Sequence, residues 1–481
     1  MMPIYDKAYF VKTAIWWSLI IAVGYFTKSL DYLLAFPLVC YAVSSRRANF
    51  LAFLLLLMTA VQCANHMISP KTVLYLYIQR GSMLLFGAVF AIKLATSGKN
   101  SIFTPFTALV IYVFYMILPS LNGWSPIISI LKIVLFICTF SVLVGISKAI
   151  VESQEANILK LRSIIVAYAL VMFGYSIVLL RFPNIGYMSM ADMTNMEIAI
   201  QLEEGISLFK GMTQHSQSLG PVAALSIVLI AGDYIFGVRK KFWPYNIALM
   251  CAIVCLWKSG SRTAMVACMF GVGLLFFAVV NGAEKLARWK RVVLGFFTQM
   301  FIVGLLMIVL VPRIRGSVLR FTVKYDTGDV PTNQITLADV TSSRIGALDN
   351  PLHNWRESPI FGNGFQVSSE MGMLRDVPIK EILTAPVEKG TWVVAILEEG
   401  GIVGMALFLA WVFIAGSRLW RQKAYIGFAA LMTLLTINLG EFCLFSLTST
   451  GCLLWALTLF AMIMDAIRLK EQRRYAYIAY N

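Results

Sequence analysis

Apolar runs of about 16 to 25 residues recur from one end of this chain to the other, and they constrain its fold more than any other feature. A helix needs about 20 apolar residues to cross the roughly 30 Å hydrocarbon layer of a bilayer. Hydrophobic residues make up 59% of the 481 residues and charged residues only 13%. A soluble core cannot bury that much apolar surface. The chain is therefore predicted to be an all-α polytopic membrane protein.

The apolar runs predict about fourteen transmembrane helices, interrupted by two long polar segments. The predicted spans lie near residues 8–27, 30–45, 48–63, 80–96, 103–119, 126–147, 163–181, 221–238, 243–258, 262–280, 293–311, 391–415, 425–439 and 442–466. This divides the chain into N-terminal helices (1–181), a first outer segment (182–220), further helices (221–311), a large loop (312–390), C-terminal helices (391–466) and a tail (467–481).

The net charge of +16 reflects membrane topology rather than nucleic-acid binding. When the spans are counted alternately from a cytoplasmic N-terminus, 22 of the 40 basic residues fall in short segments on that side. Short loops on the opposite side carry almost none, which is the pattern of the positive-inside rule. Both termini are therefore predicted to lie inside and the 312–390 loop outside. Anionic lipid headgroups are a further partner for the excess positive charge.

No metal or cofactor site is predicted. The eight cysteines all fall within or at the edges of predicted spans, where they pack between helices as small apolar side chains. The three histidines, His66, His215 and His353, share no ligand spacing. The sequence has no Walker motif and no glycine-rich dinucleotide motif, so ATP hydrolysis by this chain is not expected.

Arginines on the predicted outer side indicate an anion-binding site. They are Arg80, Arg262, Arg313, Arg315, Arg344 and Arg356. A guanidinium group binds phosphate oxygens bidentately and keeps its charge, so the pyrophosphate of a lipid carrier at the membrane surface is a suitable partner. The alternative is that each arginine pairs with a nearby carboxylate or contacts lipid headgroups.

Polar residues also stand at or near membrane depth. The segment Lys210–Pro221 places a polar cluster, including His215, where the next helix begins, and free N–H groups there favour an anion. A hydrated helix cap is the alternative. Arg262 follows the tight turn Lys258–Ser261, and Lys132 lies about a turn and a half inside a predicted span. Charges at such depth indicate function, although snorkelling to the interface would explain Lys132 without a role.

Several of these segments together resemble the O-antigen ligase and polymerase superfamily, the WaaL and Wzy type. The matching stretches are Ser259–Ala264 (a small-residue–Ser–Arg turn), Arg344–Leu348 (R-x-x-x-L), Trp355–Phe365 (Pro, apolar, Gly-x-Gly) and Leu397–Gly404 (an E-x-G-x-x-G helix start). Phe209–Gly220 is similar to an earlier periplasmic stretch of the family. The resemblance covers about residues 205–415, with order and spacing in agreement.

At one position this chain departs from the family pattern, and the departure favours one of the two branches of the family. The family commonly has His-Asn nine residues before the glutamate of E-x-G-x-x-G, and this chain has Gly390 there. In the ligase branch that histidine is the leading candidate for the base or orienting group. Its absence therefore favours the polymerase branch, with Lys389 or Glu388 as local substitutes.

The resemblance implies a GT-C-like glycosyltransferase in the bacterial inner membrane, with a periplasmic active site and no metal. A polymerase would transfer an undecaprenyl-diphosphate-linked glycan to the hydroxyl of another lipid-linked repeat unit, without a nucleotide sugar. Arg262 and Arg344 would stabilise the departing diphosphate, and Arg313, Arg315, Arg356 and Arg80 would assist in binding. Candidates for the general base are His215, His353, Glu399 or a loop carboxylate.

Three alternatives remain open. A ligase would pass the glycan to lipid A–core instead of to a second lipid-linked unit. A flippase for lipid-linked oligosaccharides, or another secondary transporter, would usually show two related halves, and this sequence shows none. A non-catalytic scaffold is the third. The implied partners are the undecaprenyl-diphosphate-linked oligosaccharide, membrane lipids and a chain-length regulator, but no nucleic acid.

Overall fold

The computed structural model describes residues 6–27, 48–65, 81, 87, 89, 103–188, 208–237, 243–282, 348–367, 391–440, 443–446 and 450–480. Within these ranges the chain is almost entirely helical, and its β-type pairing is confined to two isolated bridges, Ala64 with Thr213 and Tyr187 with Phe209. The predicted spans at 30–45 and 293–311, and all but single residues of 80–96, lie outside the described residues.

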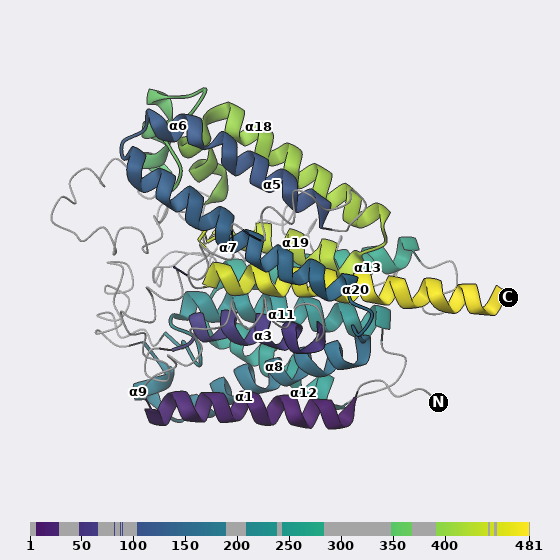
Figure 1. Cartoon of the computed structure of the whole chain (residues 1–481). Coiled ribbons are helices and arrows are strands. Elements are labelled where there is room, and N and C mark those ends of the chain that lie inside the picture. Colours follow the sequence, from purple (N-terminus) through teal and green to yellow (C-terminus); the bar gives the residue numbers. More distant parts are fainter. Residues whose placement is uncertain are drawn as a thin grey trace, which may run out of the picture.

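The described helices form a bundle of roughly antiparallel rods (Figure 1). They are α1 (Lys7–Thr27), α3 (Ala48–Gln62), α5 (Thr104–Tyr115), α6 (Ile117–Leu121), α7 (Pro126–Glu152), α8 (Ile158–Leu179), α9 (Pro183–Gly186), α11 (Ser216–Gly237), α12 (Trp243–Lys258), α13 (Arg262–Gly282), α18 (Trp392–Arg421), α19 (Tyr425–Ile437) and α20 (Thr450–Tyr480). Six of those described are long and apolar enough to cross a membrane: α7, α8, α11, α13, α18 and α20. The prediction of an all-α membrane protein is confirmed at this level.

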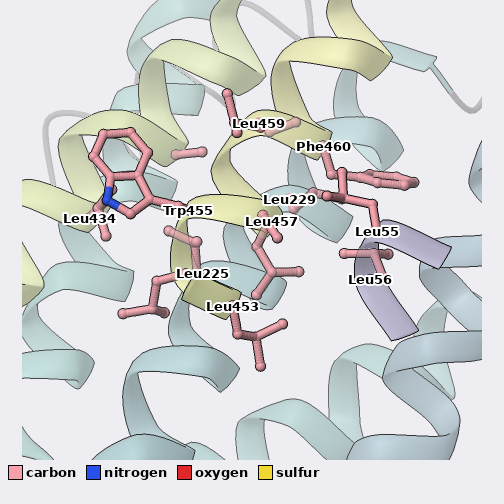
Figure 2. Packing of buried hydrophobic residues seen from close by; sticks show 14 of the residues in the cluster. Leu55, Leu56, Leu225, Leu229, Leu434, Leu453, Trp455, Leu457, Leu459 and Phe460 are labelled. Atoms are coloured by element: carbon pink, nitrogen blue, oxygen red, sulfur yellow. The ribbon is translucent and has the colours of Figure 1, made fainter. Parts of the chain in front are cut away.

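Helix α20 is the central rod of the bundle. It packs against α3, α7, α8, α11 and α19, and its side chains from Gly451 to Asp465 are buried around its whole circumference. Figure 2 shows Trp455 and Phe460 of α20 among leucines of α3, α11 and α19, including Leu55, Leu225 and Leu434. A helix that is apolar on every face is expected at the centre of a bundle, where every face meets another helix.

Several threonine and serine hydroxyls inside the apolar helices bond to a carbonyl of their own helix. Thr59 donates to the carbonyl of Leu55 at 2.8 Å, and Ser226 donates to Val222 at 2.7 Å. Hydrocarbon offers no alternative partner, so this bond to the preceding turn removes the cost of carrying a hydroxyl into the membrane. The peripheral helices instead expose large apolar side chains, such as Phe413 at 75%, as a lipid-facing surface requires.

The segments 208–215, 259–261 and 358–367 lie at one end of the bundle, here called the loop end. Helices α3, α12 and α19 end there, and α11, α13, α18 and α20 begin there. At the opposite end, α1 begins and α20 finishes, so both described termini lie on the same side (Figure 1). The described parts of the sequence motifs, at 259–264, 355–365 and 397–404, lie at the loop end.

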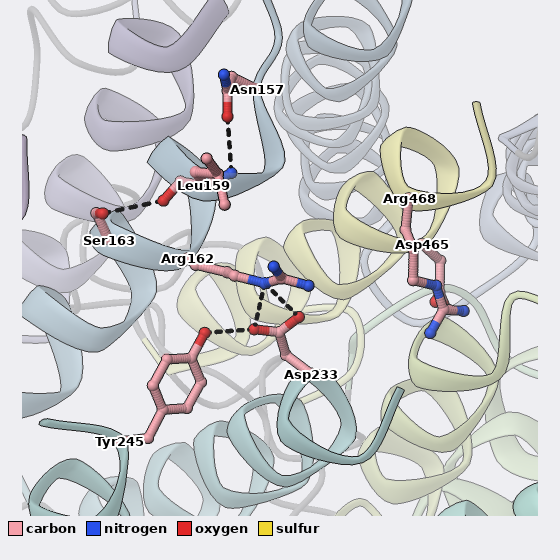
Figure 3. A network of polar contacts seen from close by, with 8 residues as sticks. All are labelled: Asn157, Leu159, Arg162, Ser163, Asp233, Tyr245, Asp465 and Arg468. Atoms are coloured by element: carbon pink, nitrogen blue, oxygen red, sulfur yellow. Dashed lines mark hydrogen bonds and ion pairs between the residues drawn. The ribbon is translucent and has the colours of Figure 1, made fainter. Parts of the chain in front are cut away.

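A buried charge network lies toward the opposite end (Figure 3). Arg162 Nε of α8 contacts both carboxylate oxygens of Asp233 on α11 at 3.0 Å, and the Tyr245 hydroxyl of α12 donates to the same carboxylate. Nearby on α20, Asp465 accepts from Arg468 at 2.6 Å. Arg162 is one of the 22 basic residues that the alternating count of spans assigns to the inner side, and the structure pairs it with Asp233 inside the protein.

Removing one member of this network should destabilise the fold strongly. Asp233→Ala leaves Arg162 buried without its carboxylate, which is expected to cost about 3–5 kcal/mol and to lower the unfolding temperature in detergent. The double variant Arg162→Leu/Asp233→Leu should lose less than Asp233→Ala alone. Glu152→Ala, which removes an exposed partner of Lys148 at 3.5 Å, is the control and should change stability by under about 1 kcal/mol. Equal losses for Asp233→Ala and Glu152→Ala would contradict a stabilising network.

Candidate functional site

The candidate site is built on a break in helix α18. Gly401 has φ 63° and ψ −163°, which interrupts the helix between Glu399 and Ile402. That backbone conformation is essentially restricted to glycine. The E-x-G-x-x-G stretch, interpreted from sequence as a helix start, therefore marks a kink inside a longer helix. The break leaves carbonyl and amide groups without partners along the helix axis.

The segment 348–367, here called the return segment, supplies the missing partners. It is helical from 348 to 357 and then turns back onto α18. Four backbone hydrogen bonds join the two: Asn363 N–H to Glu398 O at 2.8 Å, Gly364 N–H to Glu399 O at 3.1 Å, Ile402 N–H to Pro359 O at 2.9 Å, and Val403 N–H to Ile360 O at 3.2 Å. Carbonyls before the break and amides after it are both satisfied, so the two motifs form one structural unit.

Two glycines allow this close approach. A Cβ atom on Gly362 would overlap the backbone of Glu399, and a Cβ atom on Gly401 would overlap the carbonyl of Ile360. Gly362 also has a positive φ, of 80°. The first glycine of Gly-x-Gly, Gly362, and the first glycine of E-x-G-x-x-G, Gly401, are thus explained by contact between two backbones, without reference to a ligand.

Two glutamates are buried at the break. Glu398 is 1% exposed, and its Oε1 accepts from the Asn354 side chain at 2.8 Å. The Asn354 carbonyl in turn accepts from the Asn363 side chain at 2.7 Å. Glu399 is fully buried, and the Tyr115 hydroxyl donates to the neighbouring Gly400 carbonyl at 3.1 Å. Two adjacent carboxyl side chains at this depth are costly, which indicates a function for the site.

The far end of the return segment is fastened to α6 and α7. Ser120 Oγ accepts from Phe365 N–H at 3.1 Å, and Ser129 Oγ donates to the Phe365 carbonyl at 2.9 Å. Lys132 is 4% exposed and donates to the Gln366 carbonyl at 2.9 Å. Lys132 therefore does not snorkel to the interface, since its ammonium group binds the return segment inside the protein.

A second cluster surrounds the turn before α13. Gly260 has a positive φ of 66°, and Ser259 Oγ accepts from Ser261 N–H at 3.3 Å. Arg262 is the first residue of α13 and is partly exposed. Gly220 of α11 lies so close to this turn that a Cβ atom there would overlap Ser261. The sequence-predicted tight turn is confirmed, and it brings Arg262 beside the beginning of α11.

The Lys210–Gln214 segment before α11 is buried rather than hydrated. Asn65 donates through its side chain to the Gly211 carbonyl at 3.0 Å, and its N–H donates to the Met212 carbonyl at 2.8 Å. Gln214 donates to the Gln62 carbonyl at 2.9 Å. These polar groups join the end of α3 to the start of α11, which disfavours the hydrated-cap interpretation. His215 follows them, partly buried.

Residues at and just before the start of α20 contact both α11 and the return segment. Thr450 shares a 2.6 Å hydrogen bond with Ser218 of α11, which begins beside the turn that precedes Arg262. Just before α20, the ring of Phe445 packs at 5.5 Å from Phe365 of the return segment and at 5.7 Å from Tyr112. Thr450 thus contacts the start of α11, and Phe445 contacts the return segment.

The sequence-predicted site residues divide into four groups. Arg262 and His215 lie in the cluster around α11 and α13, and Glu399 lies at the break in α18. Arg356 and His353 are exposed on the helical part of the return segment. The predicted residues that lie outside the described part of the chain are Arg80, Arg313, Arg315, Arg344 and Lys389.

The sequence interpretation missed Glu398, Asn354 and Asn363. Glu398 carried a signal, because two adjacent acidic residues in an apolar helix are rarely tolerated without a role. The two asparagines carried none, since an isolated asparagine in a polar loop is ordinary. Within the described residues, no group of three His, Cys, Asp or Glu side chains could hold a metal ion.

Comparisons with known proteins leave the family open. No protein-family model matches the chain, and no curated protein matches its sequence.

Glycine replacement at the break should be far more damaging than elsewhere in the bundle. Gly401→Ala imposes a strained backbone, at roughly 1–3 kcal/mol, and drives a methyl group into the Ile360 carbonyl. We expect a lower unfolding temperature and faster proteolysis within the return segment. Gly174→Ala, in α8 with nothing within 4 Å of the new Cβ, is the matched control and should be neutral or slightly stabilising. Unchanged proteolysis in Gly401→Ala would show that the return segment does not depend on the break.

Proposed function

We propose that the chain is a polysaccharide polymerase of the bacterial inner membrane, a glycosyltransferase that acts on lipid-linked repeat units. One observation carries the proposal. Two motifs that resemble the ligase and polymerase superfamily, in 355–365 and 397–404, bind each other through four backbone hydrogen bonds at the same end of the bundle as the Arg262 turn. Two of the motifs thus form one structural unit, and the proposal is that this unit and the turn before Arg262 belong to one active site.

The position of the break supports a site at the membrane surface. The part of α18 after the break, 402–421, is about 30 Å long, which is the thickness of the hydrocarbon layer. It ends with Arg418 and Arg421, as expected of a cytoplasmic helix end. Ile360, Phe361 and Ile402 are each 55% exposed, which suits contact with lipid at the outer boundary. In this proposal the loop end is periplasmic, both termini are cytoplasmic, and about fourteen helices form a GT-C-like architecture.

The proposed reaction is a substitution at the anomeric carbon of the growing glycan. A hydroxyl oxygen of a second undecaprenyl-diphosphate-linked unit attacks that carbon, and the bond to the diphosphate oxygen breaks. The hydroxyl proton passes to a general base, for which Glu399, His215 and His353 are the candidates. Undecaprenyl diphosphate leaves with the bonding electron pair. The diphosphate is already an activated leaving group, so no nucleotide sugar or metal is required by the proposal.

Arginines would stabilise the charge that builds on the departing diphosphate. We assign this role to Arg262 and Arg344, with Arg313, Arg315, Arg356 and Arg80 in binding. Preplaced donors of this kind contribute about 3–4 kcal/mol each to transition-state stabilisation. Arg262 is suited to the role because it stands at the first turn of α13, where backbone N–H groups also favour an anion.

The first test is the surface glycan of a deletion strain, separated as a ladder beside the complemented strain. A glycan that stops at one repeat unit is the expected result. Long polymer retained on the lipid carrier, with bare lipid A–core, would indicate a ligase instead. If the chain is a flippase, its deletion should leave the lipid-linked unit on the cytoplasmic side, where a periplasmic glycosidase cannot reach it. A normal ladder would contradict all three activities for the surface glycan of that strain.

Substitution of Arg262 tests the proposed charge stabilisation. Arg262→Ala should lower the rate of glycan extension by roughly 10²–10³-fold while the protein still inserts at normal abundance. Arg262→Lys should recover only part of the activity, because an ammonium group lacks the bidentate fork. Lys258→Ala removes an exposed cation at the end of α12 before the same turn and is the control, with near-normal extension expected. Normal extension by Arg262→Ala would remove this arginine from the mechanism. Arg344→Ala is expected to behave as Arg262→Ala does.

A further inference from the structure

We propose that Asn354 and Glu398 are positioning residues, whose hydrogen bond holds the return segment on the broken helix and thereby fixes Glu399. The effect on catalysis rests on the proposed function. The contact that holds the return segment on α18 does not depend on that function. It is carried by the side-chain bond from Asn354 Nδ2 to Glu398 Oε1 at 2.8 Å, between residues that are 7% and 1% exposed.

Backbone bonds alone would leave the helical part of the return segment loosely attached. The four backbone contacts to α18 all come from residues 359–364, after the helix at 348–357 has ended. Asn354 of that helix binds Glu398 of α18 through its side chain, and Asn363 donates to the Asn354 carbonyl at 2.7 Å. This chain of bonds couples the helix that carries His353 and Arg356 to the glutamate next to Glu399.

The geometry explains why Glu398 matters for its neighbour. Glu398 and Glu399 are adjacent, and their carbonyls accept from Asn363 and Gly364 respectively. A shift of the return segment would release both carbonyls and let the turn before Gly401 rewind or fray. Since a displacement of about 1 Å can cost on the order of 100-fold in rate, loss of this contact should lower activity without touching a reacting group.

The donor and the acceptor of the Asn354–Glu398 hydrogen bond can be exchanged by substitution, which tests the role of the bond directly. In Asn354→Asp, two carboxylates face each other and the contact is lost. In the double variant Asn354→Asp/Glu398→Gln, the introduced amide can donate to the introduced carboxylate, so the bond re-forms with donor and acceptor exchanged. Glu398→Gln alone keeps an acceptor oxygen for Asn354 and should retain the contact. Glu357→Gln, on an exposed position of the same helix, is the matched control.

Docking of the return segment can be read without any enzyme assay. Val367 is fully buried, so Val367→Cys in purified full-length protein in nanodiscs should react slowly with a water-soluble maleimide. The parent protein without this substitution gives the background from native cysteines. Asn354→Asp should accelerate labelling by roughly 10- to 100-fold, and the double variant should return it to near the wild-type rate. Extension of surface glycan in cells should fall and recover in parallel.

The outcomes separate this inference from the proposed function. Unchanged labelling in Asn354→Asp, or no recovery in the double variant, would show that the Asn354–Glu398 bond does not hold the return segment on α18. Labelling that changes as expected while Asn354→Asp extends glycan normally, in a strain where Arg262→Ala does not, overturns the positioning role. If the deletion strain itself has a normal glycan, the proposed function fails, and the labelling still decides whether the contact holds the segment.

Discussion

The pairing of the return segment with the break in α18 is the contact on which the rest of the loop end depends. A membrane offers no water to backbone groups, so a helix can be interrupted only where another part of the protein supplies the partners. Here the turn at 359–364 does so, and Ser120, Ser129 and Lys132 hold its far side. Without this pairing, a kink beside two buried glutamates would be too costly to persist.

The two ends of the bundle place their buried carboxylates in different surroundings. Toward the opposite end, Asp233 receives Arg162 and a tyrosine hydroxyl, so a buried carboxylate is neutralised by groups from two other helices. Such a closed network fastens helices together and leaves little capacity for a ligand. At the loop end, Glu399 sits beside a strained backbone and a polar turn. A rigid bundle whose buried charges are paired can support a locally strained site at the membrane surface, where chemistry would take place.

The sequence predicts those parts of the fold that depend on residues close together in the chain, and it does not predict those that depend on contacts between distant residues. Spans such as 126–147 and 262–280 followed from runs of apolar residues, because hydropathy is a local property and the membrane imposes one length. The turn at Gly260 followed from local chemistry as well. The kink at Gly401 did not, because E-x-G-x-x-G fits both a helix start and an interrupted helix. Only contact with residues 359–364 decides between them, and no local pattern encodes that contact.

The same reasoning applies to the site itself. Arg262 stood out because a charge in an apolar setting is improbable by itself, and Glu399 stood out through the E-x-G-x-x-G resemblance. Asn354 did not, since its role exists only opposite Glu398, which is 44 residues away in sequence. Positioning residues of this kind are defined by their partner rather than by their own chemistry. A residue-type search therefore finds the groups that could react, whereas the groups that hold them in place emerge only when the chain is folded.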